Sequence, residues 1–289
     1  ETRRRVQETV CGAAFWFDGL FGDKGDIAAA RSSYGRVELS SEYSQFSGST
    51  TRLRFQAQVR LPALENRLSA FVGLDNEDDF VRDRSQGRLR TRTPRQIDRD
   101  EFLAGLGFAN VTTERFQSDF RVGVRNIRLP KIFVQNRFSY IAYSDEEYRL
   151  LLRSTPFWNN RDGFGLTSSM DLDRALRQDF LLRWASAATL TQETEGLDWR
   201  TALILYQNLR GARALAHEGF IRGATRAAEP LAEYGVRSIY RHPFLQERLF
   251  GELVLGYSWP RIDPALPREG TYLIGLGVEM PFGTRPETQ

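Results

Sequence analysis

The sequence predicts an all-β fold, in which about fourteen antiparallel strands close into an up-and-down barrel that crosses a membrane. Three observations favour this fold: apolar and polar residues alternate along most of the chain, the alternating runs are long, and the connections between them alternate in length. Successive side chains of a strand point to opposite faces, so period two is typical of a strand with one apolar and one polar face. Twelve or sixteen strands would fit the same pattern.

The alternation is clearest in residues 51–62, TRLRFQAQVRLP, where Leu53 and Val59 share a face and Arg52 and Arg54 share the other. The same pattern recurs up to residues 271–282 and is least regular between 213 and 241. In chain order, we expect strands at 36–46, 52–61, 67–75, 102–111, 115–125, 131–142, 147–155, 163–173, 179–190, 198–208, 213–223, 233–241, 247–259 and 271–282.

The length of these runs, about nine to thirteen residues, favours strands that cross a bilayer. Tilted membrane strands need about nine to eleven residues, whereas strands of soluble domains typically have about five or six. With an even number of strands, connections alternate between two faces. One face receives short connections at 62–66, 112–114, 143–146, 174–178, 209–212 and 242–246. The other receives longer ones at 47–51, 76–101, 126–130, 156–162, 191–197, 224–232 and 260–270.

Composition alone gives a different impression. The 289 residues are 41% hydrophobic and 27% charged, with a mean hydropathy of −0.45, values that suggest a soluble protein. No stretch provides the about 20 apolar residues that a membrane helix needs, but hydropathy averages the two faces of an alternating strand. A net charge of +3 gives little reason to expect nucleic-acid binding. With two histidines and one cysteine, Cys11, we expect no metal, cofactor or intrachain disulfide.

Residues 36–282 resemble a bacterial outer-membrane β-barrel of porin-like architecture, including a final amphipathic strand that ends in the aromatic Phe282. The resemblance is to an architecture and rests on no particular family motif. It implies the outer membrane of a Gram-negative cell, both termini in the periplasm, and contact with lipid and lipopolysaccharide. The sequence departs from many such proteins because the tail 283–289 follows the last aromatic. A soluble all-β domain with a conventional core is the alternative, since alternation is common to both.

If the apolar faces meet lipid, the polar faces line the lumen. The candidate lumen residues are Arg52, Arg54, Arg60, Arg121, Arg125, Arg149, Arg153, Arg183, Arg248, Glu38, Glu42, Glu252 and Glu279. Two interpretations remain open. Cross-strand ion pairs would stiffen the wall, whereas an excess of arginine would bias a pore toward anions.

Two segments are candidates for closing or narrowing the barrel. Residues 1–35 lack period two and contain an apolar run, which predicts a short amphipathic helix at the periplasmic interface or in the barrel mouth. Its candidate plug or partner-docking residues are Phe15, Trp16, Phe17, Leu20 and Phe21. The charged loop 76–100 is interpreted as a solvated loop, an inward constriction, or a contact for lipopolysaccharide phosphates or a surface partner.

The function that this pattern favours is a channel for small solutes, with an arginine-rich and anion-biased lumen. The alternative is a closed barrel that anchors a periplasmic or surface protein through residues 1–35 or 76–100. We do not expect an enzyme, because an outer-membrane hydrolase needs a positioned Ser–His or acid–His pair. His217 has Glu218 beside it in sequence but on the opposite face, and His242 falls in an expected periplasmic turn. Such a hydrolase remains a minor alternative.

Overall fold

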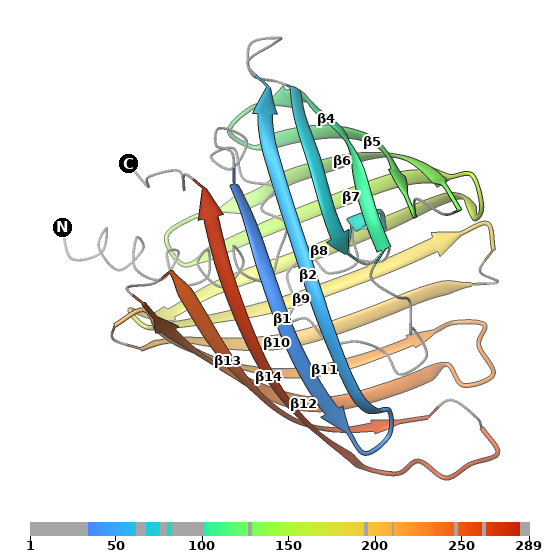
Figure 1. Cartoon of the computed structure of the whole chain (residues 1–289). Helices are drawn as coiled ribbons and strands as arrows, with labels where there is room; N and C mark the ends of the chain where they lie inside the picture. Colours follow the sequence, from blue (N-terminus) through green and yellow to red (C-terminus); the bar gives the residue numbers. More distant parts are fainter. Residues whose placement is uncertain are drawn as a thin grey trace.

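The computed structural model is a closed barrel of fourteen antiparallel strands (Figure 1). Each strand pairs with its neighbours in sequence, and β1 (Tyr34–Ser44) closes the ring against β14 (Thr271–Gly283). The structure describes residues 34–61, 68–75, 80–82, 101–126, 129–193, 196–209, 211–245, 248–261 and 264–283. The predicted all-β, up-and-down architecture is therefore confirmed, with the strand number of fourteen.

All fourteen predicted strands are present, and most of their ends agree with the prediction to within three residues. The other strands are β2 (Gly48–Leu61), β3 (Leu68–Asp75), β4 (Glu101–Thr112), β5 (Phe116–Arg125), β6 (Lys131–Ser144), β7 (Tyr148–Asn159), β8 (Gly163–Arg177), β9 (Phe180–Thr191), β10 (Leu197–Leu209), β11 (Arg213–Ala224), β12 (Leu231–Phe244) and β13 (Leu249–Pro260). Strands β7 and β8 each end four residues later than predicted, because ladder pairing continues there without apolar alternation.

Apolar side chains face outward and most charged side chains face inward. On β2, Leu53 and Val59 are 53% and 50% exposed, whereas Arg54, on the opposite face, is 7% exposed. On β14, Leu276 is 63% exposed and Glu279 is 4% exposed. A soluble domain buries its aliphatic face and solvates its charges. The barrel has the opposite arrangement, which is that of a membrane barrel.

Outward-facing aromatic residues gather at both rims of the barrel. We call the rim where β1 begins and β14 ends the terminal rim, and the opposite rim the distal rim; the start of β1 and the end of β14 lie on the same side in Figure 1. Toward the distal rim these aromatics are Tyr43, Trp158, Phe164, Trp199, Tyr234, Tyr257, Trp259 and Tyr272. Toward the terminal rim they are Phe116, Phe138, Tyr140, Tyr143, Tyr148, Phe244 and Phe282. Two such belts around an aliphatic band are typical of a wall that spans a bilayer.

The connections follow the predicted asymmetry. At the terminal rim, strands are joined by short turns such as 145–147 and the one that contains Gly211 and Ala212. In the latter turn, Gly211 and Ala212 have φ of 76° and 54°, the left-handed conformation that tight hairpin turns require. The distal rim carries the longest connection, between Asp75 and Glu101. Among the described residues, no helix has the length and apolar character needed to traverse a bilayer.

Candidate functional site

The inward faces of the strands form the candidate site. Fourteen strands about 4.8 Å apart and tilted about 40° close at a backbone radius of roughly 14 Å. This size lies between a small barrel filled by its own side chains and an open porin. The chemistry of the inward side chains therefore decides what the barrel can do.

A cluster of buried charges lies on β10, β11 and β12. The Glu218 carboxylate accepts from two arginines: Arg200 Nη2 lies 2.9 Å from Oε1, and Arg237 Nε donates to Oε2. The side chains of Arg200, Glu218 and Arg237 are 9%, 0% and 2% exposed. Four residues nearer the distal rim on β11, Arg222 pairs with Glu233. The Glu218 carboxylate of β11 thus lies between arginines of β10 and β12, whose positive charges would otherwise repel each other.

A second cluster joins β12, β13 and β14. Arg241 donates to Glu252, and its Nη2 lies 3.3 Å from Glu279 Oε1. The Arg241 side chain is fully buried, and its guanidinium carbon lies 4.2 Å from the centre of the Phe250 ring. The ring face attracts the cation and shields it from water, so this arginine is held from three sides.

Ion pairs continue around the rest of the wall. Arg52 lies 3.3 Å from Glu42, between β2 and β1, and Arg54 lies 3.9 Å from Asp75 of β3. The further pairs are Arg125–Glu101 at 3.0 Å, Arg153–Asp171 at 3.3 Å and the bidentate Arg183–Asp173 at 2.5 and 2.8 Å. Every one of these pairs joins neighbouring strands, so the network runs along the wall.

The other predicted lumen residues have the following places. Glu38 of β1 is in register with both Glu279 and Arg54. Arg121 lies 5.3 Å from the Phe80 ring, and Arg149 is opposite Asp173. Arg248 lies in the turn before β13 with an exposed side chain, away from the strand wall. Arg60 lies in β2 opposite Ser69, but its side chain is outside the described residues.

Sequence reasoning missed several buried charges of the inward face. Glu218, Arg222, Glu233 and Arg241 were not among the predicted lumen residues. Their strands showed the least regular alternation, but the spacing of Glu233, Arg237 and Arg241 every fourth residue does indicate one shared face. That spacing was the signal that would have identified them.

The beginning of the long loop lies inside the barrel. Phe80 and Val81 are 6% and 1% exposed and belong to a cluster with the inward-facing Phe71, Leu103, Phe133 and Phe157. With its amide nitrogen turned toward the loop, Gln135 of β6 donates to the carbonyls of Val81 at 2.7 Å and Phe80 at 3.0 Å. Arg82 Nη2 lies 3.2 Å from Asp162 Oδ2. The described part of this loop therefore occupies lumen space along β3 to β7.

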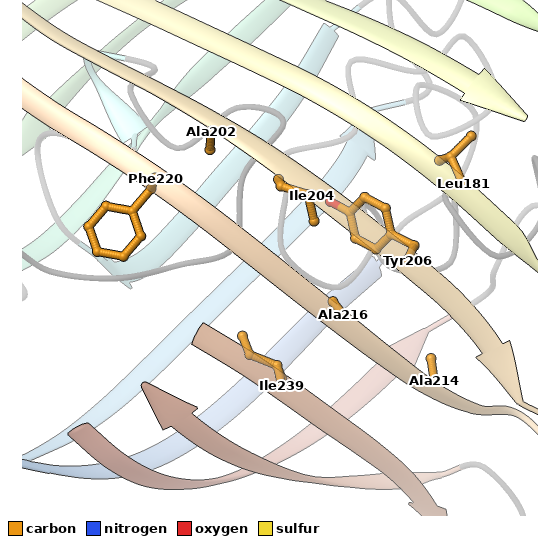
Figure 2. Packing of buried hydrophobic residues seen from close by; sticks show 8 residues of the cluster. All are labelled: Leu181, Ala202, Ile204, Tyr206, Ala214, Ala216, Phe220 and Ile239. Atoms are coloured by element: carbon orange, nitrogen blue, oxygen red, sulfur yellow. The ribbon is translucent and has the colours of Figure 1, made fainter. Parts of the chain in front are cut away.

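An apolar patch covers the inward face of β9 to β12 (Figure 2). Its members are Leu181, Ala202, Ile204, Tyr206, Ala214, Ala216, Phe220 and Ile239. Most of them lie in the half of each strand nearer the terminal rim. The inward face is therefore not uniformly polar, because small and apolar side chains lie between the ion pairs.

The histidines do not form a recognisable catalytic group. His217 Nδ1 lies 2.7 Å from Ser238 Oγ on the outer face, and among the described residues no acid orients the other ring nitrogen. His242 Nδ1 lies 3.1 Å from the Tyr240 hydroxyl. In the part of the chain that the structure describes, no group of histidine, cysteine or acidic residues is arranged to hold a metal ion. The candidate plug residues Phe15, Trp16, Phe17, Leu20 and Phe21 lie outside the described residues.

Comparisons with known proteins agree on the fold. No protein-family model and no curated protein matches the chain. The high-pH structure of OprB from Pseudomonas putida is 8% identical with a TM-score of 0.52, covering 87% of this chain and 94% of OprB. A bacterial polysaccharide outer membrane secretin is 10% identical with a TM-score of 0.50, covering 86% of this chain and 98% of the secretin. At such identities the likeness shows the fold alone, which is that of an outer-membrane β-barrel.

Proposed function

We propose that this barrel is an outer-membrane channel for small solutes. The observation that carries the proposal is the polar inward face, with arginine–carboxylate pairs on strands all around the wall. Charged groups at that depth need water or fixed partners, and a polar interior is what water-filled barrels have in common. β1 begins and β14 ends at the rim with short turns, and we place this rim in the periplasm because short turns face the periplasm in bacterial barrels. The outer face would then contact lipid, and the distal loops would contact lipopolysaccharide.

We further propose a weak preference for anions. Arginines on the inward face slightly outnumber the acids, but most of them are held in ion pairs, so the field along the lumen is nearly balanced. Arg121 lies beside the inward loop segment, 5.3 Å from the Phe80 ring, where that segment occupies lumen space, and we therefore expect its charge to influence ion selectivity strongly. The segment 80–82 acts in this account as a constriction packed on one side of the wall.

The alternative is a closed barrel that anchors a protein partner through residues 1–35 or 76–100. One observation favours it: the inward side chains of Arg241, Phe250 and Ile204 have no exposed surface. Inward side chains that are completely covered by their neighbours leave little open space in the lumen. Only the channel requires that the purified protein conducts ions across a bilayer.

The test is single-channel recording of the purified chain in planar bilayers, with folding verified by circular dichroism. We expect discrete conductance steps and, in a salt gradient, a small reversal potential of the sign for anions. Arg121→Glu should shift that potential toward cations, whereas Arg248→Glu, in an exposed turn, should shift it much less. A folded, inserted protein without conductance steps would overturn the channel and favour the anchor.

A further inference from the structure

The outer face of the barrel differs between its two halves. On β13, β14 and β1 the outward side chains in the middle of the wall are mainly aliphatic, including Leu255, Leu276 and Leu39, each at least 49% exposed. On β7 to β12, each strand instead carries a polar side chain on the outward face. These residues are Ser154, Ser168, Ser186, Thr201, His217 and Ser238, and we call them the outer polar face.

The outer polar face consists of two groups of neighbouring residues, one from Ser154 to Thr201 on β7 to β10 and the other formed by His217 and Ser238 on β11 and β12. Ser154 and Ser168 are directly opposite each other on β7 and β8. Thr201 Oγ1 lies 2.7 Å from Ser186 Oγ and accepts from the Trp184 indole at 2.8 Å. These groups lie near the middle of their strands, between the two aromatic belts. Polar side chains at that depth on a lipid-facing surface are costly, and they are usually directed at another protein surface.

His217 is the one ionisable residue of the outer polar face. Its Nδ1 lies 2.7 Å from Ser238 Oγ, and the side chain is exposed. Among the described residues, the second ring nitrogen forms no hydrogen bond, so the outward face carries a strong hydrogen-bonding group. An ionisable residue within a membrane region normally has a partner.

A notch in the surface lies two residues beyond His217 on the same strand. A Cβ added at Gly219 would have no neighbouring atom within 4 Å. Around it stand the exposed side chains of Leu203, Ile221 and Val236, which are 52%, 42% and 57% exposed. Gly219 is opposite Leu203 on one side and Val236 on the other. The outer face thus has an open position at Gly219 and, beside it, exposed apolar side chains of the size that such a space could accept.

We infer that this face binds a second copy of the same chain, so that the protein is a two-fold dimer in the membrane. A two-fold interface needs a patch that complements itself. This one offers donors and acceptors together, and Leu203 or Val236 of one copy would enter the Gly219 notch of the other. Within lipid, burying apolar surface gives no gain, so association depends on close packing at small residues and on hydrogen bonds between the two protein surfaces.

The available area is sufficient for a specific interface. Four strands, β9 to β12, at about 4.8 Å spacing and over an apolar band about 25 Å tall, provide about 480 Å² on each copy. Two copies would bury about 1,000 Å², the lower bound for a biological interface. A dimer contact on the outer face does not depend on conduction through the lumen, so either proposal can fail without the other.

The test is the oligomeric state of the full-length chain in liposomes, measured by counting photobleaching steps of singly labelled protein. We expect dimers, and Gly219→Trp should lower the dimer fraction at least fivefold because it fills the notch. Folding should be unaffected, since the space at Gly219 is open. His217→Leu should also lower the dimer fraction. The matched controls are Leu276→Trp on β14 and Ser41→Leu on β1, three and four strands around the wall from β11; Ser41 Oγ lies 3.2 Å from Thr51 Oγ1.

Disulfide trapping supplies a second readout. In a Cys11→Ser background, Gly219→Cys should form a disulfide-linked dimer on oxidation, and Leu276→Cys should not. A monomeric native chain, a dimer unchanged by both Gly219→Trp and His217→Leu, or equal crosslinking at the two cysteines would overturn the inference.

Discussion

Replacing Glu218 by glutamine should destabilise the barrel strongly. Glu218 has no exposed surface and holds Arg200 and Arg237 at once. Glutamine keeps the shape of the side chain, so no cavity forms, but two buried guanidinium groups lose their counter-charge. Removing one partner of a buried ion pair typically costs about 3–5 kcal/mol. Because the amide oxygen still accepts one hydrogen bond, we expect a loss near the lower end, about 3 kcal/mol.

The measurement is the free energy of unfolding in guanidinium chloride, for protein folded in lipid and followed by tryptophan fluorescence. The matched control is Glu42→Gln, since Glu42 pairs with Arg52 alone among the described residues, and both side chains keep some exposure. Its loss should be below about 1 kcal/mol. If Glu218→Gln cost no more than Glu42→Gln, the buried network would not be what stabilises β10 to β12.

Three further predictions concern other parts of the barrel. Phe80→Ala removes the ring that lies 4.9 Å from Phe71, and it should raise single-channel conductance because the inward segment loses its anchor. Leu276→Arg should cost about 2–4 kcal/mol of unfolding free energy in lipid, the cost of arginine at the bilayer midplane; a negligible cost would place Leu276 in water. In the turn 145–147, the Tyr143 hydroxyl and then the Tyr148 and Glu147 amides lower the pKa of Asp145. The stability that its charge contributes should therefore persist above about pH 4 and disappear as pH falls through the lowered pKa. Comparing unfolding of the native chain and Asp145→Asn across pH checks this, and a difference that grows toward acid would refute it.

Most of the fold could be predicted because a barrel wall imposes one rule on every strand. Lipid outside and a polar lumen inside force period two, so residues such as Leu53 and Arg54 reveal the strand and its orientation together. The rule weakens where strands leave the bilayer. This explains why Asn159 and Arg177, the last residues of β7 and β8, lay beyond the predicted ends.

The site was predicted less completely because contacts between strands depend on register. Alternation places Glu218 on the inward face, but only the pairing of β11 with both neighbours brings it to Arg200 and Arg237. The inward path of Phe80 likewise depends on contacts with β3 and β6, which a charged loop sequence does not encode by any period. The notch at Gly219 becomes visible only once its neighbours are in place.

The most direct test of the account is the environment of alternate residues along β14. Nitroxide labels at 274, 276 and 278, in a Cys11→Ser chain reconstituted in liposomes, should be accessible to oxygen dissolved in the lipid. A water-soluble nickel chelate should not reach them. If the nickel chelate relaxes these labels as strongly as oxygen does, the outward face lies in water and the membrane barrel is contradicted.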